Sequence, residues 1–238
     1  RLCINVVDKL IELHEVPYQA TELEKLGKGE GYCRRQVEGW NARYEKARTL
    51  NVPSFKFVRK WWLKNIPNDS KICIIHNDWR FDNIILDPHN PTEIIGVLDW
   101  EMATLGDPLM DLGSALAYWV EATDHQIFKN TRRQPTHLKG MLTREQVIHY
   151  YLEKTGLNTE NWAFYEVFGI FRLAVIAQQI YYRYYHQQTN NPAFKDFWIV
   201  IHALHIRALT RIGKQKIEAN THAQKYMTKL QQILGKEK

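Results

Sequence analysis

Residues 71–111 read KICIIHNDWRFDNIILDPHNPTEIIGVLDWEMATLGDPLMD and carry the strongest structural signal in the chain. Three short runs within them, at residues 72–75, 84–86 and 94–98, are rich in β-branched side chains, which favour strands. The turn-forming residues 87–91 separate the second run from the third. This pattern predicts a β-hairpin, with the first run as a short strand leading into it.

Polar side chains gather at the ends of these predicted strands and in the loop between the first two. They are His76, Asp78, Arg80, Asn83, Asp99 and Glu101. Carboxylate and amide oxygens are the ligands that Mg²⁺ prefers, and a guanidinium group pairs well with phosphate. The sequence therefore indicates a site for metal and phosphate at one edge of a small sheet.

The spacing His76-x-Asp78-x-x-x-x-Asn83, followed by a hairpin and Asp99, resembles the catalytic loop and metal-binding segment of protein-kinase-like phosphotransferases. The longer string HNDWRFDN…VLDWEMATLGDPLMDL is similar to the aminoglycoside and choline phosphotransferase branch. Within that branch it most resembles the kinase-like domains found alone in bacteria or fused to acyl-CoA dehydrogenases. The joint spacing is specific, whereas His-x-Asp alone would be weak.

The resemblance implies a role for each position. Asp78 would accept or orient the proton of the acceptor hydroxyl, and Arg80 would neutralise the transferring phosphoryl group. Asp99 would bind the Mg²⁺ that bridges the nucleotide phosphates, and Asn83 would ligate a second ion through its amide oxygen. His76, although part of the catalytic motif, is expected to brace the loop by hydrogen bonds.

Three neighbouring positions extend this interpretation. Glu101 lies two residues after Asp99, so in an extended segment it would share a face with it and serve as a further metal ligand. Asp111 is expected to anchor the backbone of the catalytic loop. Asn77 stands where the resembled family usually has glycine, and asparagine is the other residue that best tolerates left-handed backbone geometry.

The remaining sequence predicts helices at residues 2–16, 32–50, 108–122, 143–154, 162–185 and 192–212, and a further helix that ends before Pro67. Asp107 and Pro108 form the cap and first turn of one of them. The expected fold is α+β, a mostly helical C-terminal lobe of a kinase-like phosphotransferase over residues 1–213. Residues 214–238 are expected to form a basic tail or helix.

The sequence does not predict the second, β-rich lobe that kinase-like enzymes have. Kinase-like enzymes cover the phosphates with a β-rich lobe that also supplies a lysine, and the sequence before the first helix leaves no room for one. The glycine-rich residues 27–31, with Lys28, are interpreted as a loop. We therefore expect this chain to be the C-terminal lobe without the N-terminal lobe, and to be inactive by itself.

Composition narrows the classes of function. The three cysteines, Cys3, Cys33 and Cys73, show no metal-ligand or disulfide spacing, which is typical of packed, reduced thiols. No apolar run is expected to span a membrane and no signal peptide opens the chain, so we predict a cytoplasmic protein with no membrane partner. The net charge of +6 comes without a nucleic-acid-binding motif, so phosphorylated small ligands are the favoured partners.

Residues 162–185 are unusually rich in aromatic side chains, which we interpret as core, with a pocket wall as the alternative. Arg172, His202 and His205 are interpreted as satisfied buried residues, with substrate contact as the alternative.

The sequence thus predicts an Mg²⁺-dependent phosphotransferase that moves the γ-phosphoryl group of ATP or GTP to a hydroxyl of a small molecule. The resemblance implies an aminoglycoside-like, choline-like or hydroxyacyl-like acceptor. The alternative is a non-catalytic, pseudokinase-like binding module, and a third hypothesis, nucleic-acid binding, predicts affinity that falls steeply with salt.

Overall fold

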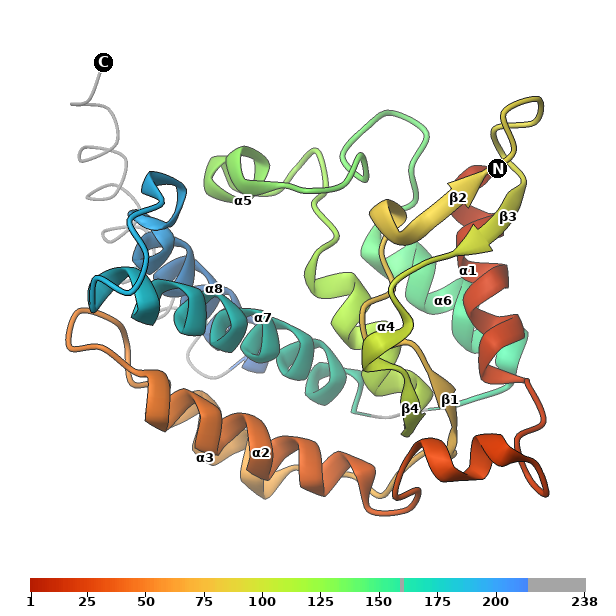
Figure 1. Cartoon of the computed structure of the whole chain (residues 1–238), viewed down its shortest axis with the longest axis horizontal. Helices are drawn as coiled ribbons and strands as arrows, with labels where there is room; N and C mark the ends of the chain where they lie inside the picture. Colours follow the sequence, from red (N-terminus) through yellow and green to blue (C-terminus); the bar gives the residue numbers. More distant parts are fainter. Residues whose placement is uncertain (159–160, 214–238) are drawn as a thin grey trace. The chain divides into compact units, whose positions relative to one another are not determined.

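The computed structural model describes residues 1–158 and 161–213 (Figure 1). The chain forms two compact units, one made of Arg1–Val37 and Ile66–Gly169, the other of Glu38–Asn65 and the chain from Ile170 onward. Helices α2 (Tyr32–Ala47) and α7 (Trp162–Tyr185) contribute to both units. We call them unit 1 and unit 2 and describe each separately. The predicted tail at residues 214–238 lies outside the described residues.

Unit 1 contains two small antiparallel sheets. Strand β2 (Ile84–Leu86) pairs with β3 (Ile94–Val97), which confirms the predicted hairpin. The first run forms β1 (Cys73–Ile75), which pairs with β4 (Thr104–Gly106), a strand the sequence did not predict. The expectation that β1 simply leads into the hairpin is therefore incomplete, because its hydrogen-bonding partner lies beyond the hairpin.

Helices α1 (Leu2–His14) and α4 (Pro108–Ala117) pack against β1 in unit 1, and α6 (Arg144–Thr155) packs against α1 (Figure 1). Asp107 caps α4 by accepting hydrogen bonds from the backbone amides of Leu109 and Met110, as predicted. Thr143, the first residue of the helix predicted over 143–154, is the N-cap of α6 and forms a capping box with Gln146. A short helix, α5 (Gln126–Thr131), occupies part of a segment predicted to be loop.

Helices α4 and α7 meet at two glycines of unit 1. A Cβ atom placed on Gly113 would lie 2.3 Å from the carbonyl oxygen of Tyr165, and one on Gly169 would lie 2.0 Å from that of Gly113. No side chain fits at such distances, so the two backbones can approach only because both residues are glycine.

Unit 2 is built around aromatic side chains. Tyr44, Phe55, Trp62 and Phe171 are buried and contact one another through tilted and edge-to-face rings. They come from α2, from α3 (Lys56–Lys64), from the residue preceding α3 and from α7. Helix α8 (Phe197–Ile212) begins later than predicted, because Pro192–Phe194 form a 3₁₀ turn.

The polar residues of these unit 2 helices have partners within the unit. The guanidinium of Arg172 lies 5.4 Å from the Trp40 ring, and His202 Nε2 lies 2.9 Å from the Asn51 carbonyl oxygen. The His205 ring lies 4.5 Å from that of Phe55. These contacts agree with the interpretation of Arg172 as a satisfied buried residue, whereas His202 and His205 have contacts but are only half-buried.

Helix α7 is long and apolar enough to cross a membrane by length and composition alone. The expectation that no run reaches that length is therefore wrong for this helix. However, 67% of its most apolar window is buried within the protein, as in the core helices of soluble proteins.

Candidate active site

The loop between β1 and β2 is held from behind by a buried carboxylate. Asp111, on α4, accepts a hydrogen bond from the backbone amide of His76 at Oδ2 and from that of Asn77 at Oδ1, both at 2.8 Å. Its side chain is fully buried. The predicted anchoring role of Asp111 is confirmed, and it fixes where the loop begins relative to the sheet.

Asn77 adopts the left-handed conformation expected of it, with φ at 66°. Its amide nitrogen donates to the Met102 carbonyl oxygen at 3.0 Å, and its amide oxygen accepts from the Tyr32 hydroxyl at 3.0 Å. The side chain therefore ties the loop to two other segments of unit 1, a task that glycine could not perform.

His76 uses both ring nitrogens within the loop. Nδ1 accepts from the backbone amide of Asp78 at 3.2 Å, and Nε2 lies 2.9 Å from the Leu98 carbonyl oxygen. Because a carbonyl can only accept, these partners assign a ring protonated at Nε2. The arrangement supports the predicted bracing function, since the buried ring has no nitrogen left for a substrate.

Asp78 and Asn83 lie side by side within the loop. The amide nitrogen of Asn83 donates to the Asp78 carbonyl oxygen at 2.8 Å and to its carboxylate oxygen at 3.2 Å. These bonds orient the Asp78 carboxylate, and because the amide nitrogen of Asn83 faces Asp78, its amide oxygen faces away from Asp78. An amide oxygen beside a carboxylate fits the donor set of a hard cation.

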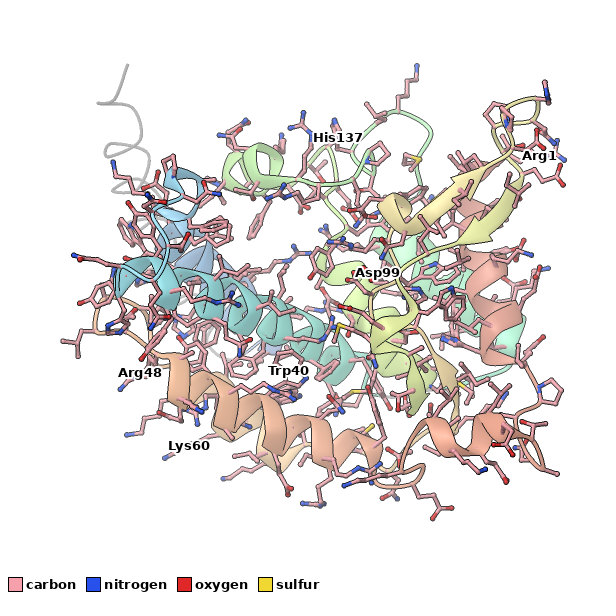
Figure 2. All side chains as sticks on the ribbon, viewed as in Figure 1. Arg1, Trp40, Arg48, Lys60, Asp99 and His137 are labelled. Carbon is pink, nitrogen blue, oxygen red and sulfur yellow. The ribbon has the colours of Figure 1, made fainter. Side chains whose placement is uncertain are left out.

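The hairpin brings Asp99 to the same end of the sheet as Asn83. The backbone amide of Leu98 donates to the Asn83 carbonyl oxygen at 2.8 Å, and Asp99 follows directly. Asp99 has φ at 64° and is exposed, at the position labelled in Figure 2. Among residues 1–158 and 161–213, its carboxylate has neither a hydrogen bond nor an ion pair, so its oxygens are available to a cation.

Glu101 does not share a face with Asp99 as expected. The segment is not extended, because Trp100–Met102 form a 3₁₀ turn that begins immediately after Asp99. Residues two apart in such a turn point in different directions. The geometric reason for pairing these two acids is therefore wrong, and a metal-binding role for Glu101 stays a prediction.

Arg80 lies on the other side of Asp78. Its Nε is 3.5 Å from a carboxylate oxygen of Asp78, and its Nη2 is 3.0 Å from one of Asp82. Its guanidinium also stacks 5.0 Å from the Tyr118 ring centre. Two acids thus offset the Arg80 charge through its Nε and Nη2, and neither of these ion pairs uses Nη1.

One residue near the loop was missed by sequence reasoning. Gln134 is buried, and its Oε1 accepts from the backbone amide of Phe81 at 3.0 Å. Its Nε2 is buried without a hydrogen-bond partner in the described part of the chain. No local pattern around Gln134 indicates this contact, since the two residues are far apart in sequence.

Another cluster in unit 1 contains Cys33, Asp69 and Asp107, whose potential ligand atoms lie within 4.8 Å of one another. The Asp69 carboxylate caps α2 by accepting from the backbone amides of Gly31, Tyr32 and Cys33. Asp107 likewise caps α4, and burial raises its pKa. These oxygens are already used by backbone amides, so we interpret the cluster as a pair of helix caps.

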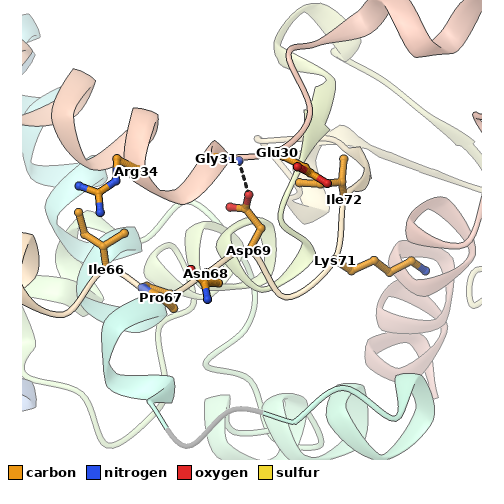
Figure 3. A pocket seen from close by; sticks show the side chains of 9 residues that line it. All are labelled: Glu30, Gly31, Arg34, Ile66, Pro67, Asn68, Asp69, Lys71 and Ile72. Carbon is orange, nitrogen blue, oxygen red and sulfur yellow. Dashed lines mark hydrogen bonds between the residues drawn. The ribbon is translucent and has the colours of Figure 1, made fainter.

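A cavity of about 460 Å³ lies beside these caps, lined by the start of α2 and by residues 66–72 (Figure 3). Asp69 in its wall bonds to Gly31, and the Lys71 ammonium donates to the His14 carbonyl oxygen at 3.3 Å. The cavity precedes β1 in the chain, whereas the catalytic loop follows it. None of the residues that line it belongs to the candidate site.

Comparisons with known proteins agree with this geometry. A model of the phosphotransferase enzyme family matches residues 1–152. The chain is 36% identical over 187 residues to acyl-CoA dehydrogenase family member 11 of Pongo abelii, covering 77% of this chain and 24% of that protein. The chain thus spans about a quarter of the length of this curated relative.

Solved structures show the same fold. A candidate aminoglycoside phosphotransferase from Ralstonia eutropha aligns with a TM-score of 0.77 and 27% identity, over 90% of this chain and 65% of that one. A choline kinase from Cryptosporidium parvum aligns with a TM-score of 0.54 and 11% identity, over 91% of this chain and 66% of that one, which supports the fold alone. Because the family model matches well over half of the 238 residues, the chain belongs to the phosphotransferase enzyme family, with a kinase-like fold.

Proposed function

We propose that the protein transfers the γ-phosphoryl group of ATP or GTP to the hydroxyl group of a small molecule, with Mg²⁺ as the metal. The observation that carries the proposal is the convergence of Asp78, Asn83 and Asp99 at one end of the hairpin. The Asn83 amide contacts Asp78, and the Leu98 amide joins the Asn83 backbone to the residue before Asp99.

In this proposal Asp78 receives the acceptor hydroxyl. The hydroxyl oxygen forms a bond to the γ-phosphorus while the bond to the oxygen that bridges the β- and γ-phosphates breaks. The hydroxyl proton passes to the Asp78 carboxylate and then to solvent. The hydrogen bond from Asn83 and the nearby Arg80 guanidinium orient that carboxylate.

Asn83, through its amide oxygen, and Asp99, through its carboxylate, would hold Mg²⁺, with Glu101 as a further candidate ligand. Bound there, Mg²⁺ would neutralise charge on the nucleotide phosphates. The exposed carboxylate of Asp99 has no protein partner among the described residues, which suits a group that binds a cation.

Apolar side chains near the metal ligands suit a nucleobase. Ile85, Leu98, Trp100 and Met102 are large, exposed and belong to the hairpin or the turn after it. Exposed apolar groups gathered beside polar ones commonly mark a ligand site. We propose that this surface, in unit 1, contacts the base of the nucleotide.

The acceptor is proposed to approach on the side of Arg80. There the Arg80 guanidinium stacks on Tyr118, and the Phe81 ring lies 5.6 Å from that of Trp119. A hydroxyacyl compound is the favoured class, because the chain is similar to acyl-CoA dehydrogenase family member 11. Choline-like and aminoglycoside-like alcohols are the alternatives. A cytoplasmic location is also part of the proposal.

The test is a phosphotransfer assay with Mg²⁺, ATP or GTP and a panel of the three acceptor classes. It uses the 238-residue chain and, in parallel, the longest product of its gene. We expect the 238-residue chain alone to turn over slowly or not at all, because its described strands form only two small sheets and no lobe over the phosphates.

The variants Asp78→Asn and Asp99→Asn separate the proposed roles. Asp78→Asn should lower kcat by about 10²–10⁴-fold while nucleotide binding persists, because it removes the base only. Asp99→Asn should weaken Mg²⁺-dependent nucleotide binding, measured by thermal shift. Glu93→Gln, at an exposed acid on the hairpin tip, is the matched control.

Absence of Mg²⁺-dependent nucleotide binding in every form of the protein would refute the proposal. Binding without turnover in the wild-type gene product would instead identify the non-catalytic binding module.

A further inference from the structure

A string of buried polar groups runs behind the catalytic loop, through helices α1, α4 and α6 of unit 1. The Tyr151 hydroxyl on α6 lies 2.7 Å from His14 Nδ1 on α1. His14 Nε2 lies 3.1 Å from Asp111 Oδ2 on α4. The same carboxylate accepts from the backbone amides of His76 and Asn77, at the start of the loop.

Every side chain of this string is buried. The exposed fraction is 2% for His14 and 0% for both Tyr151 and Asp111. A buried polar group that loses its partner bears the full cost of desolvation, and water cannot replace the partner without opening the core. Each hydrogen bond of the string therefore depends on the side chain that follows it.

The partners also determine where the protons lie. Burial opposes ionisation of Asp111, but the hydrogen bond from His14 and the two loop amides outweigh it, so the pKa of Asp111 lies below its ordinary value. An ionised carboxylate only accepts, so His14 carries a proton at Nε2. Burial raises the pKa of Tyr151, which keeps its phenol protonated and able to donate to Nδ1. With Nε2 donating to Asp111 and Nδ1 accepting from Tyr151, both ring nitrogens of His14 have partners.

We propose that His14 and Tyr151 are positioning residues for the catalytic loop. Tyr151 holds the His14 ring in place through Nδ1, and His14 then provides the third donor that holds Asp111 against the amides of His76 and Asn77. Neither side chain would touch substrate. The inference rests on the proposed function, because the loop that it positions carries Asp78.

Loss of the Tyr151 hydroxyl should affect the catalytic loop in particular. Without the Tyr151 hydroxyl, Nδ1 of His14 is a buried acceptor with no donor, so the ring is free to turn away from the Asp111 carboxylate. Asp111 then loosens its hold on the backbone amides of His76 and Asn77. Asp78, two residues after His76, shifts with them. Displacement of a reacting group by about 1 Å can lower a rate by about 10²-fold.

A neighbouring pair provides a matched control. Tyr150, the preceding residue of α6, donates from its hydroxyl to Asp8 Oδ1 of α1 at 2.6 Å. This bond joins the same two helices, but within the described part of the chain no hydrogen bond of Asp8 leads to Asp111 or to the loop. Tyr150→Phe therefore tests helix packing alone, whereas Tyr151→Phe also tests the string.

The experiment compares His14→Leu, His14→Gln, Tyr151→Phe and Tyr150→Phe with the wild type. The Gln amide nitrogen lies at the same distance along the side chain as Nε2, so it can restore the donor to Asp111. Hydrogen exchange of a peptide that covers residues 73–80 reports the loop amides without any need for activity. Nitrogen-15 spectra report the His14 tautomer, and steady-state kinetics of the gene product report kcat and KM.

We expect faster exchange in that peptide for His14→Leu and Tyr151→Phe, and no change for Tyr150→Phe. His14→Leu and Tyr151→Phe should each lower kcat by about 10–100-fold with KM for the nucleotide nearly unchanged. His14→Gln should recover most of the kcat that His14→Leu loses. The wild-type His14 should be protonated at Nε2 alone.

The inference is overturned if Tyr151→Phe exchanges like Tyr150→Phe, if His14→Gln is as impaired as His14→Leu, or if both His14 nitrogens carry protons. If His14→Leu does not fold, Tyr151→Phe and His14→Gln still decide the question. A wild-type protein without phosphotransfer would refute the proposed function, and the exchange and nitrogen-15 measurements would still decide whether the string holds the loop.

Discussion

Among single residues, Asn77 shows how the catalytic loop keeps a left-handed turn without glycine. Its φ of 66° costs a non-glycine residue free energy, but its side chain makes hydrogen bonds to Met102 and Tyr32 in return. Asparagine accepts this conformation better than other non-glycine residues, because its short polar side chain can hydrogen-bond locally.

Two substitutions separate the strain from the hydrogen bonds. Asn77→Val should destabilise the protein by about 2–4 kcal/mol, because a branched side chain at this φ is strained and both bonds are lost. Asn77→Gly loses the same bonds but relieves the strain, so its free energy of unfolding should stay within about 1 kcal/mol of the wild type. Urea denaturation measures both values, and equal stability of the two variants would contradict the argument.

Asp111 gives a prediction about pH. Its pKa is lowered in the folded protein, so below the ordinary carboxyl pKa of about 3.9 the unfolded chain binds a proton that the native state does not yet bind. The stabilisation from this carboxylate is therefore complete at neutral pH and is lost as pH falls through the folded pKa. Asp111→Asn lacks it at every pH.

The difference in unfolding free energy between wild type and Asp111→Asn should be largest near neutral pH and shrink below about pH 4. Urea denaturation at several pH values measures it. Asp82→Asn, at an exposed carboxylate, is the control for general effects of acid. A difference that stays constant down to low pH would show that Asp111 is not ionised in the native state.

Among helices and strands, local signals were predicted well and distant pairings were not. The Asp107 cap and the Thr143 capping box depend on residues within three positions of each other, so the sequence shows them directly. The strand β4 has only three residues, and its pairing of Gly106 with Cys73 depends on a distant partner. Predicted helix ends also shifted; the helix expected over 108–122 ends at Ala117.

The same contrast holds for the candidate site. The spacing of His76, Asp78 and Asn83 lies within one loop, so the sequence identified it. The contacts of that loop with Gln134 and, through Asp111, with His14 join segments that are far apart in sequence. Such contacts follow from the packing of helices, which no local pattern encodes.

The crossing of α4 and α7 gives a prediction about these two helices. Gly113→Ala or Gly169→Ala would place a Cβ atom within 2.3 Å of a backbone carbonyl oxygen, and neither backbone can yield without separating the helices. Each should destabilise the protein by about 1–3 kcal/mol or more. Thermal or urea unfolding measures the loss.

Gly39→Ala is the control for that experiment. Gly39 lies within α2, and a Cβ atom there would meet only the Arg43 guanidinium, at 3.7 Å. Alanine favours a helix more than glycine does, so this variant should be more stable by about 0.5–1 kcal/mol. A similar loss in all three variants would mean that close approach is not the cause.

For the whole molecule, the three cysteines offer a measure of how often the fold opens. Cys3, Cys33 and Cys73 are free, at most 2% exposed, and lie on α1, α2 and β1 of unit 1. Burial raises the pKa of each thiol, which lowers the population of the reactive thiolate. Their packed, unpaired state is the one the sequence predicted.

A thiol reagent at pH 8 should therefore label the native protein slowly and the guanidinium-unfolded protein rapidly, at all three cysteines. Labelling that passes through opening of unit 1 follows the population of the open state.

If Mg²⁺ and ATP bind the native site, saturation at about 100 times Kd stabilises the native state by about 2.7 kcal/mol and should slow labelling about 100-fold. Mg²⁺ alone is the control, and Asp99→Asn should abolish the protection at the same nucleotide concentration. Rapid labelling of the native wild type would show that the thiols are reached without opening, and labelling unaffected by nucleotide would count against the site itself.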